Sequence, residues 1–260
     1  MKLRAVPART GLSWVRLGLQ TFMRRPLALA GLFLLYMLTL SLLSRLPLIG
    51  NLLALALPPA MTLGLMAATR EAVAGKFPMP SVLASAFRAG RERLRAMALL
   101  GLIYALGFMA MLGISALFDG GAFAQLYLGE VALTQEVMLN EDFQSAMWIG
   151  LLIYLPLSML FWHAPALVHW QGISPLKSLF FSLLACWQNR GALTLFMLGW
   201  MGVFMLAGLV ISLLGALLGS PDLLATLLFA TALTLAAMFL SSIYFTFRDS
   251  FTTDDGQEPA

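Results

Sequence analysis

The sequence predicts an all-α polytopic membrane protein, in which six transmembrane helices form three parallel repeats of an interfacial amphipathic helix followed by a transmembrane hairpin. Three observations lead to this fold class: the composition, the spacing of the apolar runs and an internal repeat. Of the 260 residues, 60% are hydrophobic and only 11% are charged, and the mean hydropathy is +0.88. Because soluble domains contain about 25% charged residues, this chain is predicted to lie in a lipid bilayer.

The internal repeat divides the chain. Residues 156–190 align without a gap on residues 59–93, and five residue types coincide in the two copies. The matching pairs are Pro59 with Pro156, Gly75 with Gly172, Pro78 with Pro175, Ser81 with Ser178, and Arg93 with Arg190. A third, fainter copy lies near the N-terminus, where the spacing from Ser13 to Arg25 equals that from Ser81 to Arg93. We therefore predict one transmembrane domain, residues 1–247, with repeats at about 12–69, 81–168 and 176–247.

Each repeat contains two apolar runs that are long enough to span a membrane. A helix rises about 1.5 Å per residue, so roughly 20 residues cross the hydrocarbon core. The predicted spans are residues 27–43, 48–68, 97–118, 146–168, 192–218 and 223–247. Proline removes a backbone donor and bends a helix, so kinks are expected at Pro58, Pro59, Pro156 and Pro165.

Each repeat also begins with a predicted amphipathic helix in the membrane interface. In the first, residues 12–24, the apolar face consists of Leu12, Val15, Leu19 and Phe22. The second is predicted as one helix over residues 81–95, and the third covers residues 176–189. The loop at 119–145 is expected to contain one short helix within residues 123–138. The tail, residues 248–260, is predicted to be acidic, cytoplasmic and disordered.

The basic residues predict the orientation in the membrane. Fifteen of the sixteen lysines and arginines fall on one side of the predicted bilayer, and only Arg45 falls on the other. The loop at 119–145, on the side of Arg45, carries five carboxylates and no basic residue. Since basic residues near span ends are retained in the cytoplasm, both termini are predicted to be cytoplasmic and the acidic loop to face outward.

The sequence contains no motif that indicates an enzyme. It has no nucleophile elbow, no phosphate-binding glycine loop and no paired cysteines, since Cys186 is its one cysteine. The predicted spans carry no Asp, Glu, Lys or Arg, and their one histidine is His163. His169 follows six positions later, which places the two rings on different helix faces and makes no metal-binding pair. We predict a non-enzymatic protein with no catalytic residue, no cofactor, no metal and no nucleic-acid partner.

The functional hypothesis concerns three arginine residues at equivalent positions of the repeats. Arg25, Arg93 and Arg190 occupy equivalent repeat positions, each near the end of an amphipathic segment and before a span. Cytoplasmic arginine at headgroup depth attracts anionic phospholipid, so lipid is the predicted partner, with a second copy of the chain or another membrane protein as an alternative. Plain topology anchors are the simpler interpretation of the same residues. The alternative function is a small transporter or lipid-translocating protein with a path between the hairpins.

One segment of the sequence carries a resemblance that implies a cellular location. The segment HAPALVHWQGISPLKSLFFSLLACWQNRG, residues 163–191, combines an APALV run, a Gly-x-x-Pro turn and a closing Trp-x-Asn-Arg. With these motifs the chain resembles, over nearly its whole length, a family of six-span proteobacterial inner-membrane proteins. In architecture only, it is similar to the membrane domains beside some glycerophosphodiester phosphodiesterases. The resemblance implies an inner-membrane location and six spans, and it supplies no activity, substrate or catalytic residue.

Overall fold

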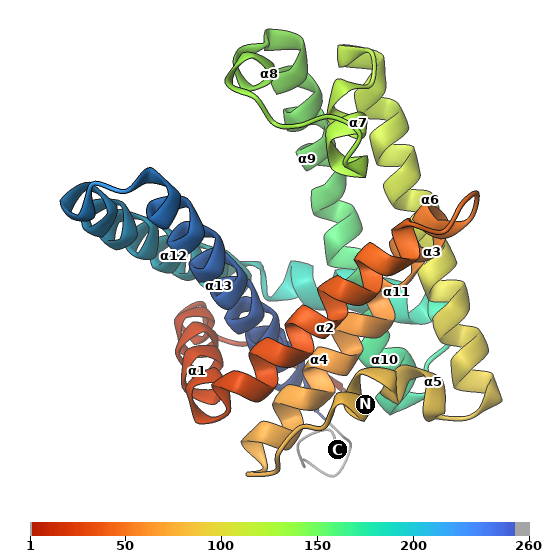
Figure 1. The fold of residues 1–260 in the computed structure, drawn as a ribbon. Helices are drawn as coiled ribbons and strands as arrows, with labels where there is room; N and C mark the ends of the chain where they lie inside the picture. Colours follow the sequence, from red (N-terminus) through yellow and green to blue (C-terminus); the bar gives the residue numbers. More distant parts are fainter. Residues whose placement is uncertain (1, 253–260) are drawn as a thin grey trace. The chain divides into compact units, whose positions relative to one another are not determined.

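The computed structural model describes residues 2–252, and it consists almost entirely of helices (Figure 1). These residues divide into two compact units. The first contains the chain up to residue 37, residues 61–88 and the chain from 184 onward, and the second contains residues 38–60 and 89–183. Three helices contribute to both units: α2 (Pro26–Ser44), α4 (Pro58–Val73) and α11 (Pro175–Gln188).

Five helical segments of the described chain are long and apolar enough to cross a membrane. They are α2, α6 (Arg91–Asp119), α9 (Glu141–Phe161) continued by α10 (Ala164–Gln171), α12 (Arg190–Leu218) and α13 (Pro221–Ser250). A sixth is formed if α3 (Gly50–Ala56) and α4 are one span, bent by 42°. The predicted class, an all-α polytopic membrane protein, is confirmed.

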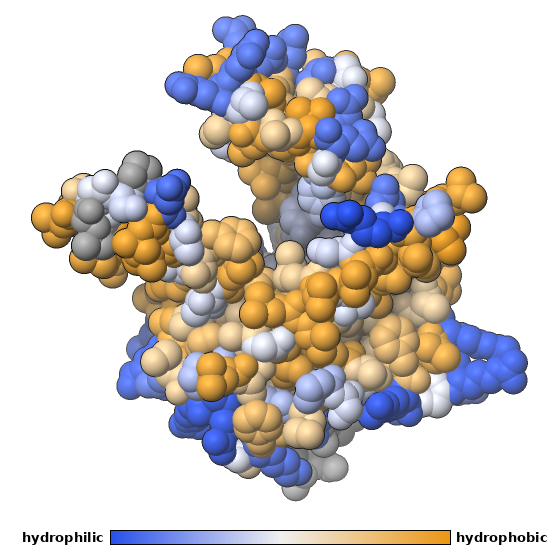
Figure 2. All heavy atoms as spheres, in the orientation of Figure 1, coloured by the Kyte–Doolittle hydropathy of each residue, from blue (hydrophilic) through white to orange (hydrophobic). Residues whose placement is uncertain are grey.

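The helices expose many apolar side chains, as membrane-spanning helices do. In Figure 2, hydrophobic side chains cover most of the visible face of α2, whereas hydrophilic side chains gather around α8 (Gln135–Leu139). On α2 the exposed side chains include Leu34, Leu38 and Leu42. Since large contiguous apolar patches mark membrane or protein contacts, these helices present the surface that a bilayer requires.

In the first unit, α1 (Thr10–Arg24) packs against α12 and α13 (Figure 1). Glycines allow this approach: a Cβ atom at Gly11 would overlap the carbonyl oxygen of Ala192, and one at Gly18 would lie 3.1 Å from the Cα atom of Ser242. Small residues at helix contacts let two backbones come close. The contact therefore depends on the absence of side chains at two positions of α1.

Aromatic residues fill the rest of this contact. Trp14 is fully buried, and its ring lies edge-on to Phe196 of α12 with the centroids 6.1 Å apart. Phe22 and Val15 are buried on the same face of α1. Leu19 is half-buried and Leu12 is 51% exposed, so only part of the predicted apolar face packs on the protein, and the interfacial position of α1 stays a prediction.

The ends of the described chain meet in the first unit. The strand β1 (Lys2–Leu3) pairs antiparallel with β2 (Phe251–Thr252), and the Arg4 amide donates to the Ser250 carbonyl at 2.9 Å. The sequence predicted a disordered tail from Arg248. In the structure Arg248–Ser250 complete α13 and two further residues form β2, while residues 253–260 lie outside the described part.

The second predicted amphipathic helix is divided in the structure. A 3-10 helix, η1 (Pro80–Ala84), leads into the short α5 (Ser85–Arg88), and α6 starts only at Arg91. Gly90 between them has φ +95°, a conformation that residues with a Cβ atom rarely adopt. The prediction of one helix over 81–95 was therefore wrong, because Gly90 ends it and assigns Arg91–Arg95 to the long apolar helix.

In the second unit, α6 and α9 pack along each other, and α7 (Ala122–Leu128) returns against both. The reversal is built by Asp119, Gly120 and Gly121. Both glycines have positive φ, +66° and +97°, and the Asp119 carboxylate accepts from the amides of Gly121 (2.9 Å) and Phe123 (2.6 Å). The loop at 119–145 thus contains two short helices, α7 and α8, where the sequence predicted one.

Candidate functional site

The three predicted lipid-binding arginines all lie at junctions between a short helix and a long apolar one. Arg25 separates α1 from α2, Arg190 is the first residue of α12, and Arg93 lies in the first turn of α6. All three are exposed, and among the described residues none forms an ion pair with a carboxylate. Their positions suit contact with a ligand outside the protein.

The arginines keep most of their hydrogen-bonding capacity. A guanidinium has five N–H donors. One Arg25 Nη2 bond reaches the Gly75 carbonyl at 3.3 Å, and one Arg190 Nη1 bond reaches the Trp187 carbonyl at 3.2 Å. The Arg190 guanidinium also lies 5.7 Å from the centre of the Trp187 ring. These contacts hold the side chains near the helix junctions and leave donors for a phosphate.

The predicted kink positions differ in their surroundings. Pro58 and Pro59 start α4, directly after the 42° bend, in the first turn where proline is tolerated. Helix α9 continues through Pro156 without a break. The helix assignment is interrupted only at Trp162 and His163, between α9 and α10, and Pro165 lies in the first turn of α10.

The break before α10 is occupied by a serine of another helix. In a continuous helix the His163 amide would donate to the Met159 carbonyl. Instead, the Ser182 hydroxyl of α11 accepts from the His163 amide at 2.9 Å and donates to the Met159 carbonyl at 2.8 Å. A side chain inserted into the backbone ladder is an established cause of a break. The two backbone groups bind Ser182, and the His163 side chain is buried, 1% exposed.

Asn189, the third residue of the Trp-x-Asn-Arg motif, connects three parts of the first unit. Its side-chain oxygen accepts from the Val6 amide at 2.8 Å, and its side-chain nitrogen donates to the Arg4 carbonyl at 3.0 Å and to the Ser250 hydroxyl at 3.2 Å. The residue is 2% exposed. The motif alone did not indicate a role for this amide.

A second polar link joins α1 to the end of α13. The Trp14 indole N–H donates to one Asp249 oxygen at 2.7 Å, and the other oxygen accepts from Arg248 Nε at 2.9 Å. These residues stand far apart in the chain, and nothing in their local sequence indicates the pairing. The Trp14 indole N–H and the Asp249 carboxylate both have partners within the protein, so we interpret this link as structural.

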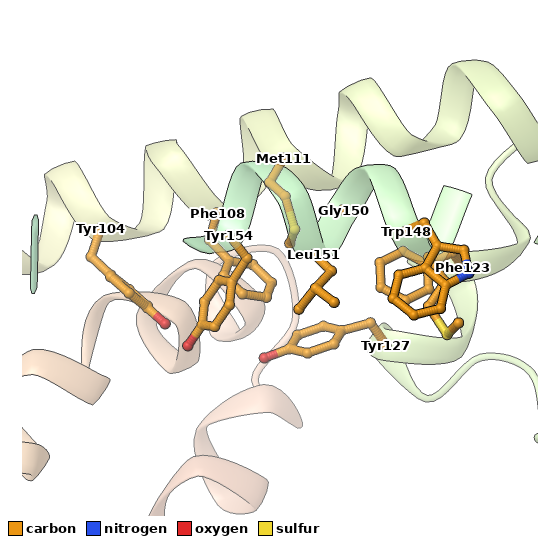
Figure 3. A pocket seen from close by; sticks show the side chains of 10 residues that line it. Tyr104, Phe108, Met111, Phe123, Tyr127, Trp148, Gly150, Leu151 and Tyr154 are labelled. Carbon is orange, nitrogen blue, oxygen red and sulfur yellow. The ribbon is translucent and has the colours of Figure 1, made fainter. Parts of the chain in front are cut away.

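An aromatic pocket in the second unit, with a volume of about 490 Å³, was not predicted from the sequence. It lies between α6, α7 and α9 (Figure 3). Six aromatic side chains line it: Tyr104, Phe108, Phe123, Tyr127, Trp148 and Tyr154. Met111, Met147, Gly150 and Leu151 complete the lining. The available signal was the aromatic pair Phe123 and Tyr127, spaced for one face of a helix in the acidic loop.

Within residues 2–252, no group of three or more His, Cys, Asp or Glu side chains could hold a metal ion.

Comparisons with known proteins support the membrane location. No family model matches the chain, and no solved structure matches it. The similarity to membrane domains beside phosphodiesterases therefore remains a prediction. A probable inner membrane protein of Burkholderia thailandensis is 34% identical over 262 aligned positions, which cover 100% of this chain and 97% of the relative. With this full-length similarity and the long apolar helices of the structure, the chain belongs to the family of that Burkholderia protein and is a multi-pass inner-membrane protein.

Proposed function

We propose that this protein is a non-enzymatic inner-membrane protein that binds anionic phospholipid on its cytoplasmic side through Arg25, Arg93 and Arg190. The observation that carries the proposal is the common position of the three exposed arginines, each beside the start of a long apolar helix. A residue at that position stands at headgroup depth when the helix enters the bilayer. Each such arginine near the surface contributes about 1 kcal/mol of attraction to anionic lipid.

The three positions are equivalent if the chain is a threefold repeat, and contacts within each unit favour this. Three contacts have the same form: the short helix of one predicted repeat touches the hairpin of the preceding repeat, and the third repeat counts as preceding the first. Gly64 of α4 meets Leu83 of η1, with a Cβ atom on the glycine only 2.8 Å from the Leu83 Cα atom. Ser182 of α11 enters the α9–α10 break, and α1 packs on α12 and α13. We propose the same architecture for all three repeats.

The surface of α11 also supports an interfacial position. Leu176, Phe180 and Trp187 are between 60% and 70% exposed, whereas Ser178 and Ser182 of the same helix are fully buried. Leu179 of this helix is buried, but a helix that turns several large apolar side chains away from the protein is suited to lie on lipid. Arg190, which follows this helix, would then meet the phosphate layer.

The phosphate chemistry requires arginine in particular. A guanidinium holds two phosphate oxygens with two parallel N–H bonds, whereas the lysine ammonium acts as a point charge. The expected result is that the triple variant Arg25→Gln, Arg93→Gln, Arg190→Gln copurifies with several-fold less anionic phospholipid than the parent, and that the triple lysine variant is intermediate. Mass spectrometry of lipids extracted from the detergent-purified protein measures this.

A matched control removes the same number of positive charges at other positions. Arg9, Arg16 and Lys177 are exposed basic residues outside the three junctions, and their triple glutamine variant should retain the parent's anionic lipid. Equal lipid loss in the two triple variants would reduce the effect to net charge. Full retention by the junction variant would show that the three arginines are topology anchors.

A further inference from the structure

The aromatic pocket of the second unit is lined by none of the three junction arginines. Its volume, about 490 Å³, falls within the roughly 300–1,000 Å³ of typical small-molecule sites. No charged side chain lines it. The ligand is therefore predicted to enter the pocket with an uncharged, largely apolar part.

The pocket is built into the fold. The Asp119 carboxylate fixes the start of α7 through two backbone amides, and this places Phe123 and Tyr127 against α6 and α9. The Tyr127 ring packs on Phe108, with the ring centres 4.7 Å apart. Gly150 of α9 makes room for the Phe123 ring, since a Cβ atom there would lie 3.1 Å from Phe123 Cε1. These contacts define the walls without a ligand.

Two residues of the pocket lining are strongly exposed, and we take their side of the pocket as its mouth. Trp148 is 63% exposed and Leu151 is 51% exposed, and both belong to a membrane-spanning segment. Tyrosine and tryptophan are enriched at the boundary between hydrocarbon and headgroups. The part of a lipid that can reach this mouth is therefore the acyl chain near its ester group.

The polar groups inside the pocket suggest how such a chain is held. Figure 3 shows the hydroxyl groups of Tyr104, Tyr127 and Tyr154 directed toward a common side of the pocket. Burial, with a smaller contribution from Tyr154, raises the pKa of the Tyr127 hydroxyl above its ordinary value, so this group stays protonated and can donate. A phenol donor matches the carbonyl oxygen of an ester.

We propose that this pocket binds one acyl chain of a membrane glycerophospholipid, with the tyrosine hydroxyls donating to its ester carbonyl. The aromatic and methionine side chains enclose the methylene groups. Because the site contains no charge, binding does not depend on the lipid headgroup.

The test uses a phosphatidylcholine probe that carries a photoactivatable diazirine in one acyl chain. The headgroup has no net charge, so the arginine junctions do not select it. The full-length protein in detergent micelles is irradiated with the probe, and labelled peptides are identified by mass spectrometry. The expected result is saturable labelling of peptides from α6, α7 and α9, which unlabelled phosphatidylcholine competes away.

Two variants of neighbouring residues provide the control. Leu151→Trp fills the pocket and should reduce this labelling at least about fivefold, whereas Leu152→Trp, on an adjacent residue that is 72% exposed and does not line the pocket, should leave it unchanged. The triple variant Tyr104→Phe, Tyr127→Phe, Tyr154→Phe keeps the walls and removes the donors. It should raise the probe concentration needed for half-saturation about two- to tenfold, the range expected for lost hydrogen bonds.

Several outcomes would overturn the proposal. One is labelling spread evenly over the apolar surface, and another is an equal response of Leu151→Trp and Leu152→Trp. An unchanged half-saturation in the triple phenylalanine variant would remove the ester assignment. Competition by a polyisoprenoid alcohol but not by phosphatidylcholine would assign the pocket to another lipid class. The junction variant Arg25→Gln, Arg93→Gln, Arg190→Gln should label as the parent does, so the two proposals fail independently.

Discussion

Replacing Gly11 with alanine is expected to destabilise the contact of α1 with α12 by about 1–3 kcal/mol, the usual effect of adding a methyl group to a filled space. The added Cβ atom would overlap the Ala192 carbonyl oxygen and lie 2.7 Å from the Phe196 amide nitrogen. Both obstacles are backbone atoms, which cannot rotate away, so the helices must separate. Separation exposes the Trp14 ring, and thermal unfolding followed by tryptophan fluorescence measures the effect in detergent micelles.

The control for this variant is Gly202→Ala in α12, where nothing lies within 4 Å of the added atom. Alanine is intrinsically more favourable than glycine in a helix by about 0.5–1 kcal/mol, so this change should be neutral or slightly stabilising. Opposite signs for the two variants support the packing of α1 described above. If Gly11→Ala melted at the same temperature as Gly202→Ala, that packing would be incorrect.

Replacing Asn189 with alanine is expected to have the second largest effect. The change removes the partner of the Val6 amide, the Arg4 carbonyl and the Ser250 hydroxyl. A buried polar group left without a partner costs about 1–3 kcal/mol, and a buried amide that serves three groups is expected to reach the upper part of that range. The Val6 amide should also exchange its hydrogen for deuterium faster, because it loses its acceptor.

Asn51, an exposed residue of α3, provides the comparison for Asn189. Asn51→Ala should leave both the melting temperature and the exchange of the N-terminal peptide unchanged. Hydrogen exchange measured by mass spectrometry separates the effect on the N-terminal arm, residues 2–9, from a general loss of stability. Unaltered protection of this peptide in Asn189→Ala would contradict the proposed link between the arm and α13.

Long apolar runs in the sequence were sufficient to predict five of the six proposed spans, and the sixth corresponds to the bent pair α3 and α4. Each span carries its own signal, since about 20 consecutive apolar residues have few alternatives to a membrane helix. The short helices were harder to predict. Residues 81–95 have a continuous amphipathic pattern, yet Gly90 adopts a positive φ and divides them. A periodic pattern reports which residues are apolar and does not report where the backbone turns.

The partners of individual side chains could not be predicted from local sequence. Asn189 binds Arg4 and Ser250, which are far apart in the sequence. Ser182 enters a helix break for which Pro165 was the one signal in the sequence. The aromatic pocket needed the reversal at Asp119 to bring α7 back against α6 and α9. Such contacts depend on the packing of helices distant in sequence, whereas hydropathy and charge are properties of the segment itself.

The orientation of the chain is the premise on which the lipid proposal depends, and single cysteines test it most directly. Native Cys186 is buried, and burial raises the pKa of its thiol to about 12, so it carries little of the thiolate that reacts with maleimide. Leu133 in the acidic loop and Phe77 in the basic link before η1 are both more than half exposed. Each can be replaced by cysteine in an otherwise native chain.

The measurement is labelling of whole cells with a membrane-impermeant maleimide, before and after the inner membrane is permeabilised. We expect Leu133→Cys to react in intact cells and Phe77→Cys to react only after permeabilisation, because the basic residues hold their side in the cytoplasm. The opposite pattern, or reaction of both cysteines in intact cells, would contradict the cytoplasmic placement of Arg25, Arg93 and Arg190.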